Sequence, residues 1–285
     1  AAIERRSIAA YLAGFFRLAS LVAWLRISAS FMAVTFAYAW LKVSVPLVNH
    51  ALWDVELFRL DRWLHFGVSP NELAVELLGD TPLLPALDVW YALWLITIFL
   101  AWSWAAAHPE LALRRQFVFG CALLSVIGPW LYLAVPALGP CFAQPAVFED
   151  VVDEMPRAAA TQRALASNYA RMIAGRDGTL SRFNPYLGVA ALPSLHVGAH
   201  WFFALWCRRH ARRFFPVWAV ATALTFVGSL VTGWHYAVDG YAGMLLAWGV
   251  FAVTDRLLPL ARTTGPDVAA DVELSSASAA APSNG

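Results

Sequence analysis

The sequence predicts an all-α integral membrane protein with six transmembrane helices. Of its 285 residues, 60% are hydrophobic and only 14% are charged, whereas a typical soluble domain carries roughly 25% charged residues. Long apolar runs recur along the chain, and each is long enough to cross the hydrocarbon core of a bilayer as a helix. The formal net charge of +1 argues against a nucleic-acid partner, because such partners are bound by an excess of basic residues.

The apolar runs set the positions of the six spans and of the segments that flank them. The spans are expected at about residues 27–48, 86–107, 116–138, 189–207, 214–233 and 236–258. Residues 1–26 are expected to form an amphipathic segment, because arginines are spread among their apolar side chains. The six-span membrane domain covers residues 27–260. Residues 261–285 are rich in Ala, Ser and Pro, which predicts a disordered tail.

Two stretches between the spans are too polar to cross a membrane. Residues 49–85, after the first span, mix apolar and charged side chains, which predicts short helices at the membrane interface. Residues 139–188 form the outer loop between spans three and four, and we expect interfacial helices there as well. The carboxylates of Asp54, Asp61 and Asp88 lie near this interface in the sequence and are expected to be solvated.

The distribution of arginines predicts the orientation in the membrane. Positive charge in short connections marks the cytoplasmic side, and the connections between spans two and three and between spans four and five are basic. The residues concerned are Arg114, Arg115, Arg208, Arg209, Arg212 and Arg213. Both termini are then cytoplasmic, and spans four and six begin at the extracytoplasmic face. The Ala-, Arg- and Trp-rich composition indicates a high-GC bacterial chain, and hence a plasma membrane.

Two polar motifs stand at the starts of spans four and six. Ser194 and His196 open one of these segments, and His235 and Asp239 open the other. Ionisable side chains are rare within membrane-embedded segments and usually mark a function. By the arginine distribution both motifs lie at the extracytoplasmic boundary, so we expect their side chains to lie close together.

The spacing of these residues suggests nucleophilic and acid–base chemistry. On a helix, Asp239 would lie one turn from His235 and could accept its Nδ1 proton, which leaves Nε2 free as a nucleophile or base. Ser194 follows a proline at a helix start, where free backbone N–H groups bind phosphate oxygens. Two histidines with a site for an anion between them predict phosphoryl transfer.

The same residues also fit roles that involve no phosphoryl transfer. His235 and Asp239 are compatible with a structural polar pair between helices, and Ser194 with a simple helix cap. His200 is expected to be a packing or lipid-headgroup contact, with a supporting contact to His196 as the alternative. Gly243 is expected to allow close helix packing. A transporter or flippase that relays protons through the histidines would need polar residues at mid-depth, where these spans are apolar.

The two motifs resemble the second and third signatures of a known enzyme family. Pro193-Ser194-x-His196 and His235-x-x-x-Asp239 are similar to those of the type-2 phosphatidic acid phosphatase superfamily, as is the six-span layout. The resemblance implies that His235 forms a phosphohistidine, that Asp239 orients it, and that His196 is the general acid. It also implies that Ser194 contacts phosphate, that the substrate is a lipid phosphate with an alcohol or water as acceptor, and that no metal or cofactor takes part.

The departures from these signatures point to one branch of the superfamily. The phosphatase branch has an arginine six residues before the nucleophilic histidine, where this chain has Ser229, and its Lys/Arg-containing first motif is missing from residues 136–141. The pattern is more similar to that of inositol-phosphorylceramide synthases. This resemblance implies an inositolphosphotransferase that moves a phosphoryl headgroup between phospholipids and sphingolipids. A lipid phosphate or polyprenyl pyrophosphate phosphatase stays open, because both reactions share the phosphohistidine.

The missing basic residues leave the phosphate charge to be met elsewhere. We expect the outer-loop arginines to bind it, and Arg182 first, because it lies nearest the second motif. The other outer-loop arginines are Arg157, Arg163, Arg171 and Arg176. Lys42, in the first span, is expected only to extend its ammonium toward water. The sequence does not predict the oligomeric state.

Overall fold

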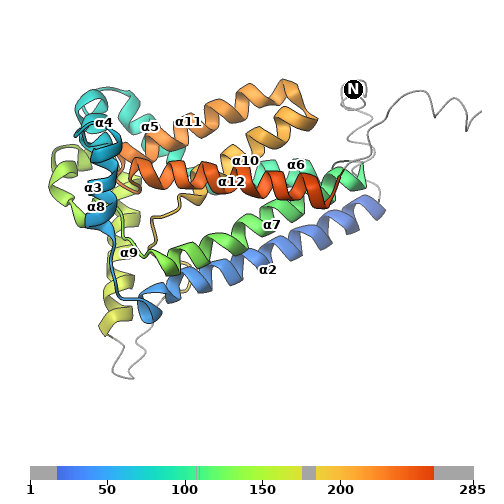
Figure 1. Cartoon of the computed structure of the whole chain (residues 1–285), viewed down its shortest axis with the longest axis horizontal. Coiled ribbons are helices and arrows are strands. Elements are labelled where there is room, and N and C mark those ends of the chain that lie inside the picture. Colours follow the sequence, from blue (N-terminus) through green and yellow to red (C-terminus); the bar gives the residue numbers. More distant parts are fainter. Residues whose placement is uncertain (1–17, 107, 109, 175–183, 260–285) are drawn as a thin grey trace, which may run out of the picture.

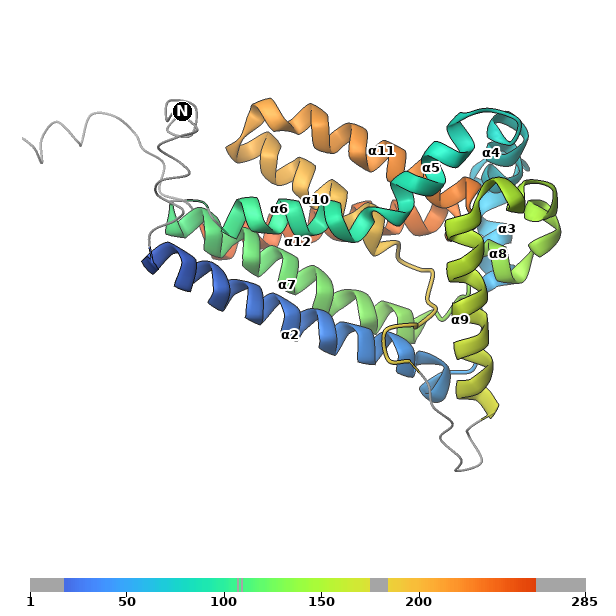
Figure 2. The same cartoon turned by 180° about the vertical axis from the view of Figure 1, so that it is seen from behind.

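The computed structural model describes residues 18–106, 108, 110–174 and 184–259, and every regular element within them is a helix. The long helices run side by side as a bundle (Figures 1 and 2). They are α2 (Leu18–Val48), α5 (Leu83–Ala92), α6 (Trp94–Ala106), α7 (Leu111–Ala134), α10 (Leu195–His210), α11 (Phe215–Val231) and α12 (Ala237–Leu257). Helix α10 packs against both α11 and α12, and α2 packs along α7.

Four of these helices, or five with one bent pair, are long and apolar enough to cross a membrane. The four are Trp24–Val48, Leu111–Ala134, Arg212–Val231 and Ala237–Leu257. Helices α5 and α6 meet at a bend of 52° and would together make the fifth. The remaining predicted span coincides with α10, whose 16 residues are fewer than the ~18–20 that a membrane-spanning helix needs. The all-helical membrane class is therefore confirmed, while the number six stays a prediction.

The two segments predicted on either side of the membrane domain lie mostly outside the described residues. Residues 1–17 of the expected amphipathic segment and the whole of the expected tail, within residues 260–285, are not described. Residues 18–26 belong to α2 and continue without a break into the first candidate span.

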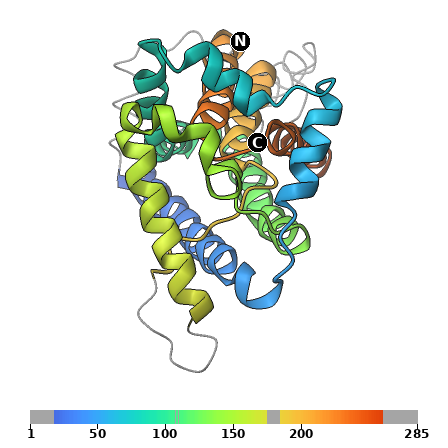
Figure 3. The ribbon, with the colours of Figure 1, turned by 90° about the vertical axis from the view of Figure 1, so that its left-hand side faces the viewer.

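A second group of helices, called the short helices although α9 has 19 residues, gathers at one end of the bundle and falls within the two polar stretches (Figures 1 and 3). They are α3 (Asp54–Leu64), α4 (Pro70–Leu78), α8 (Pro140–Ala143), the 3₁₀ segment η2 (Pro145–Glu154) and α9 (Pro156–Ala174). Their place at a membrane interface stays a prediction. Helix α9 crosses this end at a steep angle to the long helices (Figure 2). The start of α7, which holds Arg114 and Arg115, and the connection from α10 to α11, which holds Arg212 and Arg213, lie at the opposite end (Figure 2).

An aromatic core holds α6, α7 and α10 together. Phe117 of α7 stacks on Phe203 of α10 with ring centroids 5.4 Å apart and meets Trp206 edge-on at 5.3 Å. Trp102 of α6 packs on the same phenyl ring and is buried. Gly120 lies directly under Phe202, where any Cβ would collide with the ring. The core therefore fixes α10 against its neighbours over the half that lies away from the short helices.

Two glycines bring the starts of α10 and α12 into contact. A Cβ on Gly198 would lie 2.9 Å from the carbonyl oxygen of Gly243, so the prediction that Gly243 serves close packing is confirmed. The approach also lets the N–H of Ser194 donate to the carbonyl oxygen of Asp239 at 2.8 Å. The two polar motifs are joined by this crossing.

The expectation that three aspartates are solvated at the interface is wrong. Asp54, Asp61 and Asp88 are only 6%, 1% and 1% exposed. Each carboxylate accepts backbone N–H groups from a segment far along the chain, because the free N–H groups of turns and helix starts need acceptors once they are buried. Burial disfavours the charged form and so raises the pKa of Asp54 and of Asp61 above the usual value of an aspartate. The hydrogen bonds from the backbone partly offset this rise.

Each of these carboxylates anchors a different segment at the same end of the bundle. Asp54 receives the N–H groups of residues 138 and 139 after α7, the closer at 2.8 Å. Asp61 receives those of residues 237 and 238 at 3.0 and 2.9 Å, at the start of α12. Asp88 receives those of residues 157 and 158 at 3.1 and 2.8 Å, at the start of α9. The short helices are thereby tied to the long ones by buried, charge-assisted hydrogen bonds.

Candidate active site

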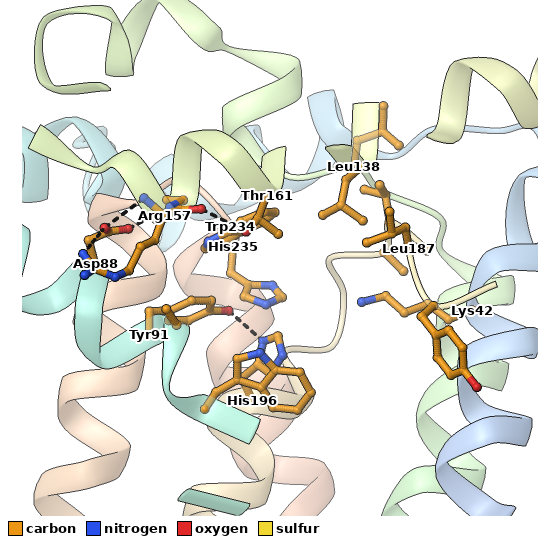
Figure 4. Close-up of a pocket in the computed structure, with 18 residues that line it drawn as sticks. Lys42, Asp88, Tyr91, Leu138, Arg157, Thr161, Leu187, His196, Trp234 and His235 are labelled. Atoms are coloured by element: carbon orange, nitrogen blue, oxygen red, sulfur yellow. Dashed lines mark hydrogen bonds and ion pairs between the residues drawn. The ribbon is translucent and has the colours of Figure 1, made fainter. Parts of the chain in front are cut away.

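A cavity of about 310 Å³ lies where the short helices meet the bundle. Its walls come from α2, α5, α6, α9, α10, the segment 186–190 and the turn before α12. His196 and His235 both line it, and Figure 4 shows their rings one above the other. The structure therefore brings the two motif histidines into one cavity, with ring centroids 5.9 Å apart.

His235 stands in the turn between α11 and α12 rather than on α12 itself. Helix α11 ends at Val231, and Gly233 then takes a positive φ of 73°, which glycine adopts without strain. The carboxylate of Asp239 reaches back from the first turn of α12, with Oδ2 3.4 Å from His235 Nδ1. The same Oδ2 accepts the Tyr236 N–H at 2.9 Å. The two residues therefore meet as the i,i+4 spacing predicted, although they do not share one helix.

The turn that carries His235 is held from outside by two side-chain amides. Asn71 of α4 donates to the carbonyl oxygens of Leu230 and His235 at 2.9 and 3.0 Å. Gln162 of α9 donates to that of Thr232 at 2.7 Å. With Asp61 bound to the next residues, the short helices α3, α4 and α9 all contribute to fixing the backbone on both sides of the histidine.

His196 lies in the first turn of α10 and is positioned by aromatic side chains. Its Nδ1 is 2.7 Å from the hydroxyl oxygen of Tyr91 on α5 (Figure 4). The ring of Trp94, the first residue of α6, packs on it at 4.4 Å between centroids. With Nδ1 engaged, Nε2 is the nitrogen left for proton transfer.

Ser194 and His200 flank His196 and do not line this cavity. Ser194 caps α10, with its hydroxyl oxygen accepting the Val197 N–H at 3.5 Å, and it is fully buried. His200 is buried too, with Nδ1 2.7 Å from the His196 carbonyl oxygen and Nε2 2.9 Å from the Thr97 hydroxyl. Burial rules out a lipid-headgroup contact for His200, and its position fits both a packing role and a contact that supports His196.

Two cations, Lys42 and Arg157, line the cavity, and Arg182 lies outside the described residues. Arg157 is one of the outer-loop arginines that were expected to bind the phosphate. Lys42 of α2 is the only lysine of the sequence. Its ammonium extends into the cavity opposite the histidines (Figure 4) and lies 5.5 Å from the Tyr132 ring centroid. Within the described part of the chain no carboxylate lies within 4.0 Å of it. From the sequence alone, this ammonium was expected only to reach water.

Arg157 is the second cation of the cavity and is held by a buried carboxylate. It begins α9, and its guanidinium lies 3.6 Å from Asp88 while its side chain stays 54% exposed. Asp88 thus fixes both the start of α9 and the arginine beside it. A contact of this kind depends on residues 69 positions apart, so the sequence carried no signal for it.

The donor groups of the cavity suit an anion better than a metal ion. Lysine, arginine, two histidines and a tyrosine hydroxyl supply N–H and O–H donors. In the described ranges no three His, Cys, Asp or Glu side chains are grouped so as to hold a metal ion. The arrangement provides a nucleophile with an orienting carboxylate, a second histidine for proton transfer, and positive charge opposite them.

Comparison with known protein families agrees with this chemistry. The family model of the PAP2 superfamily matches residues 55–253, which is more than half of the chain and includes both histidine motifs. No match was found among curated proteins or among solved structures. Members of the PAP2 superfamily are phosphatases or phosphotransferases. The chain belongs to the PAP2 superfamily.

Proposed function

We propose that the chain is a membrane-embedded phosphotransferase that moves a phosphoryl headgroup between lipids through a phosphohistidine. One observation carries this proposal: His235, in contact with the Asp239 carboxylate, faces His196 in a cavity that also holds Lys42 and Arg157. A nucleophile, an acid–base group and two cations are the parts that phosphoryl transfer without a metal ion requires.

The first half of the reaction transfers the phosphoryl group to the protein. The Asp239 carboxylate holds the proton of His235 on Nδ1, so that the lone pair on Nε2 is free to attack phosphorus. The bond between phosphorus and the oxygen of the lipid alcohol breaks, and its electron pair stays on that oxygen. His196 donates a proton from Nε2 to this oxygen, and the lipid alcohol leaves.

The second half returns His235 to its starting form. His196, now neutral, takes the proton from the hydroxyl of an acceptor alcohol, and the oxygen attacks phosphorus. The phosphorus–nitrogen bond breaks, its electrons return to His235 Nε2, and the new phosphodiester leaves. Water in place of the alcohol would give hydrolysis, so the lipid phosphate or polyprenyl pyrophosphate phosphatase is the alternative.

Lys42 and Arg157 balance the charge that builds up on the non-bridging oxygens. A cation held at a site of low dielectric stabilises such charge more than it does in water. Lys42 is free of a carboxylate partner among the described residues, so its charge is available to a ligand. Arg182 remains a candidate third cation, and Ser194 supports the site as the cap of α10.

The inositolphosphotransferase branch and the extracytoplasmic face are parts of the same proposal. Ser229 takes the place of the phosphatase-branch arginine and is buried, with its hydroxyl donating to the Phe226 carbonyl oxygen, so this position supplies no cation. The start of α7 and the connection from α10 to α11, which hold the arginines that predict the orientation, lie at the end of the bundle opposite α9 (Figure 2), and α9 lines the cavity. This arrangement supports an extracytoplasmic site with cytoplasmic termini, since short basic connections face the cytoplasm.

A product assay tests the proposal. Purified protein in detergent is given phosphatidylinositol with ceramide, or with a diacylglycerol of different chain length, and new phospholipid and water-soluble inositol phosphate are followed together. We expect a new headgroup-bearing lipid that is lost in His235→Ala. Inositol phosphate alone, equally dependent on His235, would replace transfer to an alcohol with hydrolysis. Turnover that persists in His235→Ala would overturn both.

A further inference from the structure

A strap of non-helical chain, residues 184–191, forms the wall of the cavity next to Lys42 and ends shortly before α10. Residues 186–190 of this strap line the cavity, and Figure 4 shows Leu187 beside Lys42, across the cavity from the histidines. Because the strap has no regular hydrogen bonding of its own, its position depends on the contacts that it makes with neighbouring elements.

Asn168 of α9 holds the first half of the strap. Its side-chain amide donates to the carbonyl oxygens of Asn184 and Leu187 at 3.0 and 2.8 Å, and its Oδ1 accepts the Asn184 N–H at 2.7 Å. The residue is buried and does not line the cavity. Since all three hydrogen bonds go to backbone groups, Asn168 fixes the path of the strap without reaching a ligand.

Gly188 packs the middle of the strap against the backbone of α2 at Lys42. A Cβ on Gly188 would lie 2.8 Å from the backbone nitrogen of Val43 and 3.0 Å from the carbonyl carbon of Lys42, so one of the two backbones would have to move. The φ of Gly188 lies outside the left-handed region. Glycine is therefore needed at this position for the close approach alone, and an alanine would act by pushing the strap and α2 apart.

The far end of the strap is held as well. Ala191 donates its N–H to the Ala137 carbonyl oxygen at 2.9 Å, and Ala190 belongs to the same buried apolar cluster as Tyr132. The ammonium of Lys42 lies over the ring of this tyrosine. The strap, α2 and the tyrosine ring thus form one packed unit around the lysine.

We propose that Asn168 and Gly188 are positioning residues, which through the strap set where the Lys42 ammonium lies relative to the two histidines. This inference rests on the proposed function, in which Lys42 balances the charge on the phosphoryl oxygens. A flexible lysine does this well only if its backbone is held in place, because a misplacement of about 1 Å can cost about 100-fold in rate. Asn168 does not reach the cavity and Gly188 has no side chain, so both act through Lys42.

A double-mutant cycle tests whether the strap acts through Lys42. The turnover of phosphatidylinositol with ceramide is measured for the full-length wild type, Gly188→Ala, Lys42→Met and the double variant. Gly188→Ala should lower kcat/KM at least about tenfold when Lys42 is present, and by less than about twofold in the Lys42→Met background. Asn168→Ala should show the same pattern and is the second variant should Gly188→Ala not fold.

The matched control is Gly249→Ala on α12, where an added Cβ meets nothing within 4 Å, and it should behave as wild type. Equal losses from Gly188→Ala in the two backgrounds would show that the strap acts on the histidines or on stability rather than on Lys42. That result would overturn the inference.

Chemical labelling of Lys42 provides a second readout that needs no turnover. An amine-reactive reagent with peptide mapping gives the orthovanadate concentration that protects half of this lysine. That concentration should rise at least about tenfold in Gly188→Ala and in Asn168→Ala, and it should keep its wild-type value in Gly249→Ala. Unchanged protection in both strap variants, or a wild type that vanadate does not protect, would overturn the inference. Weaker protection in the strap variants without any lipid turnover by the wild type would instead contradict the proposed function alone.

Discussion

The side-chain amide of Asn71 donates a hydrogen bond of 3.0 Å to the backbone carbonyl oxygen of His235. These residues lie 164 positions apart in the sequence, on a short helix at the end of the bundle and in a turn between two long ones. The same amide nitrogen donates to the Leu230 carbonyl oxygen. Helix α4 therefore supports the candidate active site directly, and the proposed nucleophile is positioned through its own backbone.

Replacing Asn71 tests this positioning role. Asn71→Ala leaves two buried carbonyl oxygens without their donor, which should lower the free energy of unfolding by about 1–3 kcal/mol. Because the turn is then free to shift, kcat should fall at least about tenfold while KM changes little. Steady-state kinetics and thermal unfolding measure the two effects.

The chain offers a matched control for this variant. Asn49 also donates its amide to a backbone carbonyl oxygen, that of Leu133 at 2.8 Å, but does not line the cavity. Asn49→Ala should lose stability and keep kcat. Equal kcat values for the two variants would show that Asn71 serves stability alone.

Removing the charge of Lys42 should weaken the binding of phosphate and of the transition state. Lys42→Met should lower kcat/KM by about 10²- to 10³-fold, the usual effect of losing one preorganised electrostatic contact. Lys42→Arg keeps the charge with a different shape and should recover part of the loss. Arg26→Met, near the other end of α2, is the control and should behave as wild type.

Because Lys42 is the only lysine of the sequence, an amine-reactive label reports on it independently of turnover. Orthovanadate should protect the Lys42 peptide from labelling, and the terminal amine, resolved by peptide mapping, should stay reactive. Labelling of Lys42 at the same rate with and without vanadate would exclude it from the phosphate site.

Asp239→Asn should abolish most activity and leave the fold intact. An asparagine oxygen can still accept the Tyr236 N–H, but it no longer stabilises the Nδ1-protonated form of His235. We expect kcat to fall on the order of 10²- to 10⁴-fold. The control is Asp61→Asn, which leaves one of the two N–H groups at the start of α12 without its acceptor and has no contact with the His235 side chain in the structure, so that it reports the effect of a weakened helix start alone. Similar kcat losses in both variants would mean that Asp239 acts only as a helix cap.

The fold class and the meeting of the two motifs were predictable because they depend on local patterns. Apolar runs of sufficient length define the long helices, and polar interruptions define the short ones. His196 and His235 were expected together because both open segments that start on the same side of the membrane. Gly243 was recognisable as a close-packing residue because a glycine within a membrane helix, here the helix that carries Asp239, lets another helix approach closely.

What could not be predicted depends on contacts between distant segments. A single lysine in an apolar run, such as Lys42, looks the same whether it faces headgroups or a cavity. In the sequence alone, a carboxylate such as Asp61 looks like a solvated side chain at the membrane interface. Only the structure shows that it accepts the N–H groups at the start of a distant helix. The position of His235 outside α12 had a signal in Gly233, whose positive φ ends the preceding helix, but the i,i+4 spacing alone favoured one continuous helix.

Trapping the phosphoenzyme tests the central claim most directly. Purified protein is mixed with phosphatidylinositol carrying ³²P and denatured within milliseconds in alkali, in which phosphohistidine is stable and from which acid releases it. We expect acid-labile label on the peptide that contains His235, none in His235→Ala, and loss of turnover in the same variant. Label on another residue, or turnover in His235→Ala at the rate of wild type, would contradict the phosphohistidine mechanism.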